Sequence, residues 1–90
     1  ISGSYDNDSA NSRLIELLFQ RCNVLGAETY VWDNKTKPLP IVGEEGSWDS
    51  INVKEFQELA SSVDAFVLSS PEFHGTMSGV MKNNFTLLSE

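Results

Sequence analysis

The segment Ser-Ser-Pro-Glu-Phe-His-Gly-Thr at residues 69–76 combines residue types that could bind a flat heterocyclic ring. Phe73 and His74 offer planar surfaces, and backbone N–H groups along such a loop can donate hydrogen bonds to the polar edge of a ring. Pro71 removes one donor and fixes φ, so the chain turns rigidly here. Gly75 allows close backbone approach or a positive φ. The segment is therefore one candidate ligand site.

An ordinary turn between a strand and a helix explains the same segment equally well, with Thr76 or Ser78 as the helix N-cap. His74 is more typical of a hydrogen-bonding loop histidine than of a metal ligand, because no cysteine or second histidine lies at metal-ligand spacing. Ser69 and Ser70 lie near this histidine, but the Gly-x-Ser-x-Gly motif of hydrolases is absent. We therefore predict neither a metal site nor a hydrolytic triad.

A polar loop earlier in the chain, at residues 2–11, leads into a helical segment and could bind an anion. It is the first loop in chain order, and residues 69–76 form the second loop. Unpaired backbone N–H groups and the positive end of the helix dipole meet at such a position. Ser4, Ser9 and Asn11 add short side chains that can hydrogen-bond a phosphate. Helix capping alone also explains Ser9 and Asn11, so this loop too has two interpretations.

Asp6 and Asp8 count against a phosphate in this loop, since two carboxylates repel a dianion unless they point outward or pair with a base. The pattern Asp-Asn-Asp is also a weak indication of a cation site or of a phosphatase nucleophile. A calcium loop would need a glycine at its sixth position, which is Asn11 here. A phosphatase aspartate would directly follow an apolar strand, whereas Gly-Ser-Tyr intervenes.

The composition argues against several classes of partner. The 90 residues include 13 acidic and 6 basic side chains, and the formal net charge of −7 repels nucleic acid and anionic membranes. No apolar run reaches the roughly 18 residues of a membrane span, and the first residues do not resemble a signal peptide. The single cysteine, Cys22, allows no intrachain disulfide, which fits a cytoplasmic protein.

Helical periodicity predicts three helices that must position the two loops. The first covers residues 12–25 and is ended by Gly26, the second covers residues 53–63, and the third runs from residue 77 or 78 to about residue 88. The apolar positions expected on their buried faces are Leu14, Leu17, Leu18, Cys22 and Leu25, then Val53, Phe56, Leu59, Ala60 and Val63, then Met81, Phe85 and Leu88.

Strand signals alternate with these helices. Residues 27–32 are rich in β-branched and aromatic side chains, and the apolar run at residues 65–68 is typical of a strand buried on both faces of a parallel sheet. Ile1 is expected to end a further strand, and residues 33–50, with two prolines and two glycines, to form a long loop. The alternation predicts an open α/β domain with a parallel sheet, whose ligands bind beyond the carboxyl ends of the strands.

Both polar loops resemble motifs of the NADPH-dependent FMN reductase family, which has a flavodoxin-like fold. The family's first loop, Gly-Ser-x-Arg-x-x-Ser-x-Asn, corresponds to Gly-Ser-Tyr-Asp-Asn-Asp-Ser-Ala-Asn at residues 3–11. Its second motif, Pro-Glu-Tyr-His/Asn-Gly-Ser followed by Gly-x-Leu-Lys-Asn, corresponds to Pro-Glu-Phe-His-Gly-Thr at residues 71–76 and Gly-Val-Met-Lys-Asn at residues 79–83. The resemblance implies that residues 1–90 form an incomplete flavodoxin-like α/β domain with a three-layer parallel sheet, matching the first half of a family member.

The resemblance also implies FMN and NAD(P)H as cofactors. The residues that it places around the FMN phosphate are Ser4, Ser9, Ala10 and Asn11. The residues that it places along the flavin ring, mostly through their backbone, are Pro71, Glu72, Phe73, His74, Gly75 and Thr76. Hydride would pass from NAD(P)H to the flavin and electrons then to a small-molecule acceptor, namely a quinone, an azo dye, a metal oxyanion or free flavin. The protein would supply orientation without a catalytic side chain. The resemblance also implies a homo-oligomer, because members of the family tend to form dimers or tetramers.

Two residues depart from the family's motifs. Asp6 stands where the family has an arginine, which reverses a charge beside the phosphate. Phe73 replaces a tyrosine, which keeps the ring and loses a hydroxyl. The alternative function is a catalytically incomplete flavin-binding or oligomerisation module. A flavodoxin-type electron carrier is a weaker interpretation, because the loop at residues 71–76 disfavours it.

Overall fold

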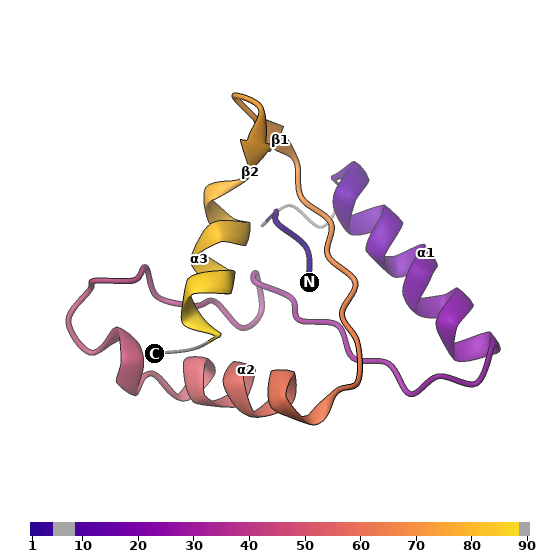
Figure 1. The fold of residues 1–90 in the computed structure, drawn as a ribbon, viewed down its shortest axis with the longest axis horizontal. Coiled ribbons are helices and arrows are strands. Elements are labelled where there is room, and N and C mark those ends of the chain that lie inside the picture. The colour runs from indigo at the N-terminus through magenta and orange to yellow at the C-terminus, as the bar shows by residue number, and fades with distance from the viewer. Residues whose placement is uncertain (5–8, 89–90) are drawn as a thin grey trace.

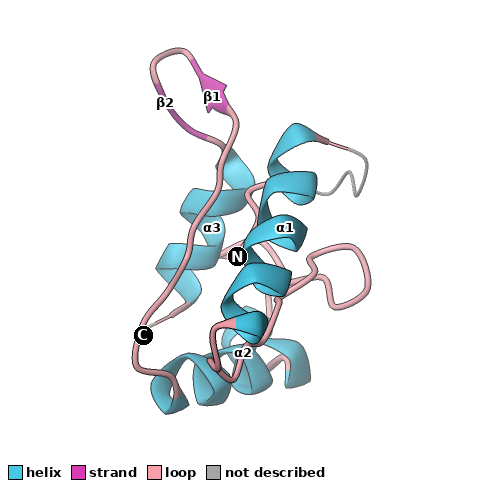
Figure 2. Ribbon diagram, turned by 90° about the vertical axis from the view of Figure 1, so that its right-hand side faces the viewer, coloured by secondary structure: helices cyan, strands magenta, loops and turns pink. Residues whose placement is uncertain are grey.

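The computed structural model describes residues 1–4 and 9–88 of the chain, and Figure 1 shows their arrangement. Its helices and strands are, in chain order, α1 (Ala10–Val24), the short 3-10 helix η1 (Ser47–Asp49), α2 (Ile51–Ser62), β1 (Glu72–Phe73), β2 (Thr76–Met77) and α3 (Gly79–Leu87). Figures 1 and 2 show α2 below the lower ends of α1 and α3, with the β1–β2 hairpin projecting beyond the upper end of α3.

All three predicted helices are confirmed, and each is preceded by a serine N-cap. Ser9 is the N-cap of α1, and its hydroxyl accepts a hydrogen bond from the amide of Ser12 at 3.1 Å. Ser50 and Ser78 cap α2 and α3 in the same way. Such caps satisfy N–H groups that the first helical turn leaves unpaired. Gly26 follows α1 with a φ of 95°, which agrees with its predicted role in ending that helix.

The hydrophobic core joins α2 and α3 to the long loop between α1 and α2. Its buried members are Trp32, Leu39, Val53, Phe56 and Leu87. The rings of Trp32 and Phe56 have centroids 4.9 Å apart, and the Nζ atom of Lys37 lies 5.6 Å from the Trp32 ring centroid. Because Leu39 is buried, the predicted loop at residues 33–50 is irregular but belongs to the core.

The predicted parallel sheet is not confirmed over the described residues. Residues 27–32 and 65–68 are assigned to no strand, and the two strands present, β1 and β2, pair antiparallel. One parallel bridge joins Ser2 to Ser69. Backbone hydrogen bonds flank this bridge, since the amide of Gly3 donates to the Ser69 carbonyl at 2.6 Å.

The reason lies in the backbone partners of these segments. On the side of Ser2 away from Ser69, the Ser2 carbonyl accepts a hydrogen bond from the side-chain Nδ2 of Asn34 at 2.9 Å, rather than from a backbone amide. A strand is held by backbone hydrogen bonds along its length. The short segment at residues 1–3 offers too few of them to order longer neighbours into a sheet.

The prediction that residues 65–68 are buried on both faces was wrong. Phe66, Val67 and Leu68 are 50%, 48% and 43% exposed. The predicted buried stripe of α1 is also wrong in part, because Leu14 and Leu17 are exposed and Ile15 is the buried residue of that helix. Among the residues described, no element covers these apolar side chains, and burial requires a covering partner.

Candidate functional site

The two polar loops begin at neighbouring backbone positions. The Ser2–Ser69 bridge aligns the start of the first loop with the start of the second. The Ser69 hydroxyl also donates to Oδ1 of Asn11, at 2.5 Å, in the first turn of α1. The second loop therefore contacts both ends of the first, although 58 residues separate Ser69 from Asn11. The structure brings together the two segments that the sequence predicted to share a ligand.

The second loop is a β-hairpin in the structure. Phe73 pairs with Thr76, and the two residues between them, His74 and Gly75, have φ values of 51° and 81°. Two consecutive positive φ values are typical of the type I′ turn, whose twist matches that of antiparallel strands. The predicted positive φ of Gly75 is confirmed. The interpretation of the segment as an ordinary strand-to-helix turn misses this hairpin.

The hairpin presents its side chains to solvent. Phe73 is 57% exposed, and Glu72, His74 and Thr76 are exposed as well. Pro71, at the base, is half-buried. An exposed ring at the end of a rigid hairpin can contact a planar ligand without first leaving a packed position.

The first loop is described at its two ends. Ser9 caps α1, so the capping interpretation of this residue is confirmed, and Asn11 contacts Ser69. Ala10 is exposed as the first residue of the helix, and Ser4 is half-buried. The amides of Ala10 and Asn11 lie in the first helical turn, where the helix itself provides no acceptor for them. The predictions that concern Asp6 and Asp8 lie outside the described residues.

Three residues of the site were not predicted from the sequence. The hydroxyl of Ser78 donates to the carbonyl of Gly3 at 2.6 Å, and the hydroxyl of Ser70 accepts from the amide of Ser78 at 2.9 Å. Ser78 gave a sequence signal only as an N-cap, and its partner Gly3 is 75 residues away. Asn34, which is 2% exposed, follows the expected strand at residues 27–32, and that position was the only signal for it.

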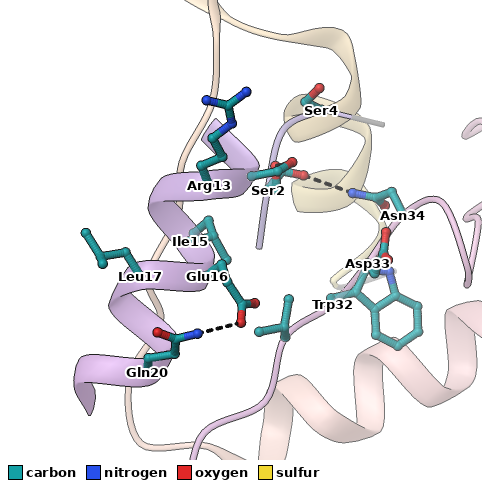
Figure 3. Close-up of a pocket in the computed structure, with 12 residues that line it drawn as sticks. Ser2, Ser4, Arg13, Ile15, Glu16, Leu17, Gln20, Trp32, Asp33 and Asn34 are labelled. Atoms are coloured by element: carbon teal, nitrogen blue, oxygen red, sulfur yellow. Dashed lines mark hydrogen bonds between the residues drawn. The ribbon is translucent and has the colours of Figure 1, made fainter. Parts of the chain in front are cut away.

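A cavity of about 520 Å³ lies beside the first loop (Figure 3). Its lining residues are Ser2, Ser4, Ser12, Arg13, Ile15, Glu16, Leu17, Gln20, Val31, Trp32, Asp33 and Asn34. Of the predicted cofactor-binding residues, only Ser4 lines it. The hairpin lies elsewhere, so this cavity is the space between α1 and residues 31–34 and is not the predicted ring site.

Arg13 contributes a positive charge near the first loop. It is exposed in the first part of α1, and Figure 3 shows its guanidinium at the same end of the cavity as Ser4.

Two other kinds of feature are absent from the described part of the chain. Within residues 1–4 and 9–88, no group of three or more His, Cys, Asp or Glu side chains could hold a metal ion. In the same part of the chain, no helix has the length and apolar character needed to cross a membrane.

Comparison with known proteins agrees with the two motifs. The family described as NADPH-dependent FMN reductase matches residues 1–90. FMN-dependent NADPH-azoreductases of Staphylococcus aureus strains USA300, NCTC 8325 and N315 are each 32% identical over 88 residues, which cover 92% of this chain and 47% of the relative. The chain thus spans about half the length of the curated relatives that it matches. No solved structure gives a significant match. Because the family match covers the whole chain, this protein belongs to the NADPH-dependent FMN reductase family, whose fold is flavodoxin-like.

Proposed function

We propose that the chain is the FMN-binding part of an NAD(P)H-dependent FMN reductase. The FMN phosphate would lie at the start of α1 and the flavin ring against the β1–β2 hairpin. The observation that carries this proposal is the adjacency of the two loops, through the Ser2–Ser69 bridge and the Ser69–Asn11 hydrogen bond. FMN has its phosphate and its ring at opposite ends, so a site for it needs two such segments held together.

The described residues at the start of α1 fit a phosphate. The amides of Ala10 and Asn11 and the dipole of a 15-residue helix favour an anion there. Ser4 and Ser9 would add hydroxyl groups. Arg13 would contribute a positive charge at the edge of the site, where the family's motif has its arginine at the position of Asp6 instead.

The hairpin fits the flavin ring. Phe73 supplies an exposed aromatic face, and the absence of a side chain at Gly75 lets a ring approach the backbone. The other predicted contacts, Pro71, Glu72, His74 and Thr76, would line the ring mainly through main-chain atoms. These residues orient a bound ring and need no acid–base role.

Bound FMN would supply the redox chemistry, by accepting hydride from NAD(P)H and passing electrons to a small-molecule acceptor. The names of the Staphylococcus aureus relatives favour NADPH as the donor and an azo compound as the acceptor, ahead of a quinone, a metal oxyanion or free flavin. We also propose a cytoplasmic homo-oligomer. The exposed apolar residues 66–68 support self-association, because large exposed apolar patches mark interfaces.

A flavin-binding or oligomerisation module without turnover is the second candidate. It is favoured by one observation, that the chain spans 47% of each relative. Residues supplied by the remainder of a longer protein would then complete the reductase.

Titration of the chain with FMN, followed by flavin fluorescence and by absorbance near about 450 nm, tests the proposal. We expect saturable binding that Phe73→Ala weakens about tenfold, since aromatic contacts contribute about 0.5–1.5 kcal/mol beyond burial. Tyr30→Ala is the matched control, because Tyr30 is a similarly exposed aromatic residue outside the loops. Failure to bind FMN would refute the proposed site. Binding without NADPH oxidation would favour the module.

A further inference from the structure

Ser78 makes one contact more than an N-cap requires. Its hydroxyl accepts from the amide of Met81 at 3.1 Å, which is the capping bond, and donates to the carbonyl of Gly3 at 2.6 Å. The side chain is 2% exposed, so both bonds are shielded from water. A serine hydroxyl has a single proton. The Ser78 hydroxyl donates that proton to the Gly3 carbonyl of the first loop. The helix cap uses only the hydroxyl oxygen, as an acceptor.

Ser70 ties the same serine to the base of the hairpin. Its hydroxyl accepts from the amide of Ser78 at 2.9 Å and lies 3.2 Å from the Ser78 hydroxyl. The Ser70 hydroxyl has a single proton and two possible acceptors for it, the Pro71 carbonyl at 2.9 Å and the Ser78 hydroxyl. The hydrogen bond from the Ser78 amide to the Ser70 hydroxyl therefore closes the base of the hairpin. It lies beyond the last pair of the β-ladder, Glu72 with Met77.

Gly3 completes the contact because it has no side chain. A Cβ atom built there would lie 2.8 Å from the hydroxyl oxygens of both Ser70 and Ser78, and 3.0 Å from the Cα of Ser70. Those distances are shorter than a methyl group tolerates. The backbone of the first loop can approach the two serines only at a glycine.

We propose that Gly3, Ser70 and Ser78 form a clasp that holds the phosphate loop and the ring hairpin in register, with Ser78 as a positioning residue for FMN. The clasp rests on the proposed function, since it names how the two halves of that site are kept together. Ser78 itself does not contact FMN. Ser78 acts by fixing the distance between the phosphate site and the ring site, which FMN must occupy at once. When one end of FMN is bound, this fixed distance raises the effective concentration of the other end at its own site.

Riboflavin separates this role from a general effect on folding, because it has the flavin ring without the phosphate. A ligand that engages the hairpin alone gains little from a fixed distance to the phosphate loop. We expect Ser78→Ala to weaken FMN at least about tenfold and riboflavin less than about threefold, by fluorescence titration. Ser78→Thr keeps a hydroxyl and should return the FMN affinity to within about threefold of the unaltered protein.

Two further variants sharpen the comparison. Ser70→Ala removes the tie to the hairpin stem while leaving the Ser78–Gly3 and Ser78–Met81 bonds in place, and should also weaken FMN more than riboflavin. Ser50→Ala is the matched control, since it removes the N-cap hydroxyl of α2, 3.5 Å from the amide of Val53 and outside both loops. It should shift neither affinity. Equal losses for FMN and riboflavin in Ser78→Ala would overturn the proposal.

Amide hydrogen exchange at Gly3, measured by NMR without flavin, tests the clasp independently of FMN. Exchange should be faster in Ser78→Ala than in the unaltered chain, and unchanged in Ser50→Ala. If the unaltered chain binds neither flavin, the proposed function fails and the exchange rates alone decide whether the clasp exists. An unchanged Gly3 rate in Ser78→Ala overturns the clasp, whatever the flavin titrations show.

Discussion

Neutral side chains connect the two loops. The Ser69 hydroxyl contacts Asn11, the Ser78 hydroxyl contacts the Gly3 backbone, and none of these groups carries a charge. Salt screens interactions between exposed charges and has little effect on buried neutral hydrogen bonds. If FMN affinity depends on salt, that dependence should therefore arise from charged residues near the phosphate. The hydrogen bonds between the two loops should not contribute to it.

Asp6 stands where the family's motif has an arginine, so a change of charge at this position tests the proposed phosphate site. We expect Asp6→Arg to tighten FMN binding about tenfold at low salt, because a hydrogen bond to a charged group contributes about 1.5 kcal/mol or more. The gain should shrink as salt is raised. Asp49→Arg makes the same charge change at an exposed position of η1 and is the control for net charge. Unchanged affinity in Asp6→Arg would mean that Asp6 does not face the phosphate.

The candidate site was predictable where its signals are local. Pro71 and Gly75 indicated a tight turn, and Ser9 indicated a helix start, because proline, glycine and capping residues act through their own backbone neighbourhood. The contact between Ser78 and Gly3 was not predictable in the same way. It depends on the three-dimensional approach of segments that lie far apart in the chain.

At the level of elements, α3 holds the long loop at residues 33–50 through one side chain. Oδ1 of Asn83 accepts from the amide of Val42, and its Nδ2 donates to the carbonyl of Pro40, both at 2.9 Å. One amide side chain thus pairs two backbone groups of an irregular segment. This arrangement keeps Leu39 in the core, although no helix or strand contains that residue.

Replacement of Asn83 should therefore destabilise the fold. We expect Asn83→Ala to lower the free energy of unfolding by about 1–3 kcal/mol, because it leaves two part-buried backbone groups without their partner. Asn52→Ala is the control, since its amide makes a single exposed bond to the Pro38 carbonyl. Urea unfolding measures both. Equal, small effects would show that the bonds of Asn83 are readily replaced by water.

The helices and the strands differ in how far the sequence determines them. Helix hydrogen bonds form within one segment, so periodicity was sufficient to predict α1, α2 and α3, with cap signals in addition for α1 and α3. Residues 27–32 and 65–68 have strand-like composition, but strand pairing requires a neighbour along the whole segment. Within the described residues, residues 1–3 make backbone hydrogen bonds to residues 67 and 69, at one end of the second segment and just beyond it.

For the whole molecule, the distribution of apolar surface is uneven. The core lies among α2, α3 and the loop at residues 33–50, whereas α1 and residues 66–68 expose apolar side chains. The proposed homo-oligomer would cover part of that surface, and bound FMN would stabilise the folded state by mass action. Both effects should raise the thermal midpoint, the first with protein concentration and the second with FMN concentration.

The left-handed backbone at position 74 limits which residue types can occupy it. A φ of 51° is unfavourable for most side chains, and asparagine, aspartate and histidine are the residues that tolerate it best. The related motif, with histidine or asparagine before the glycine, fits that short list. These two residues have quite different acid–base chemistry but share a tolerance of positive φ. The backbone geometry alone is therefore enough to account for a histidine at position 74.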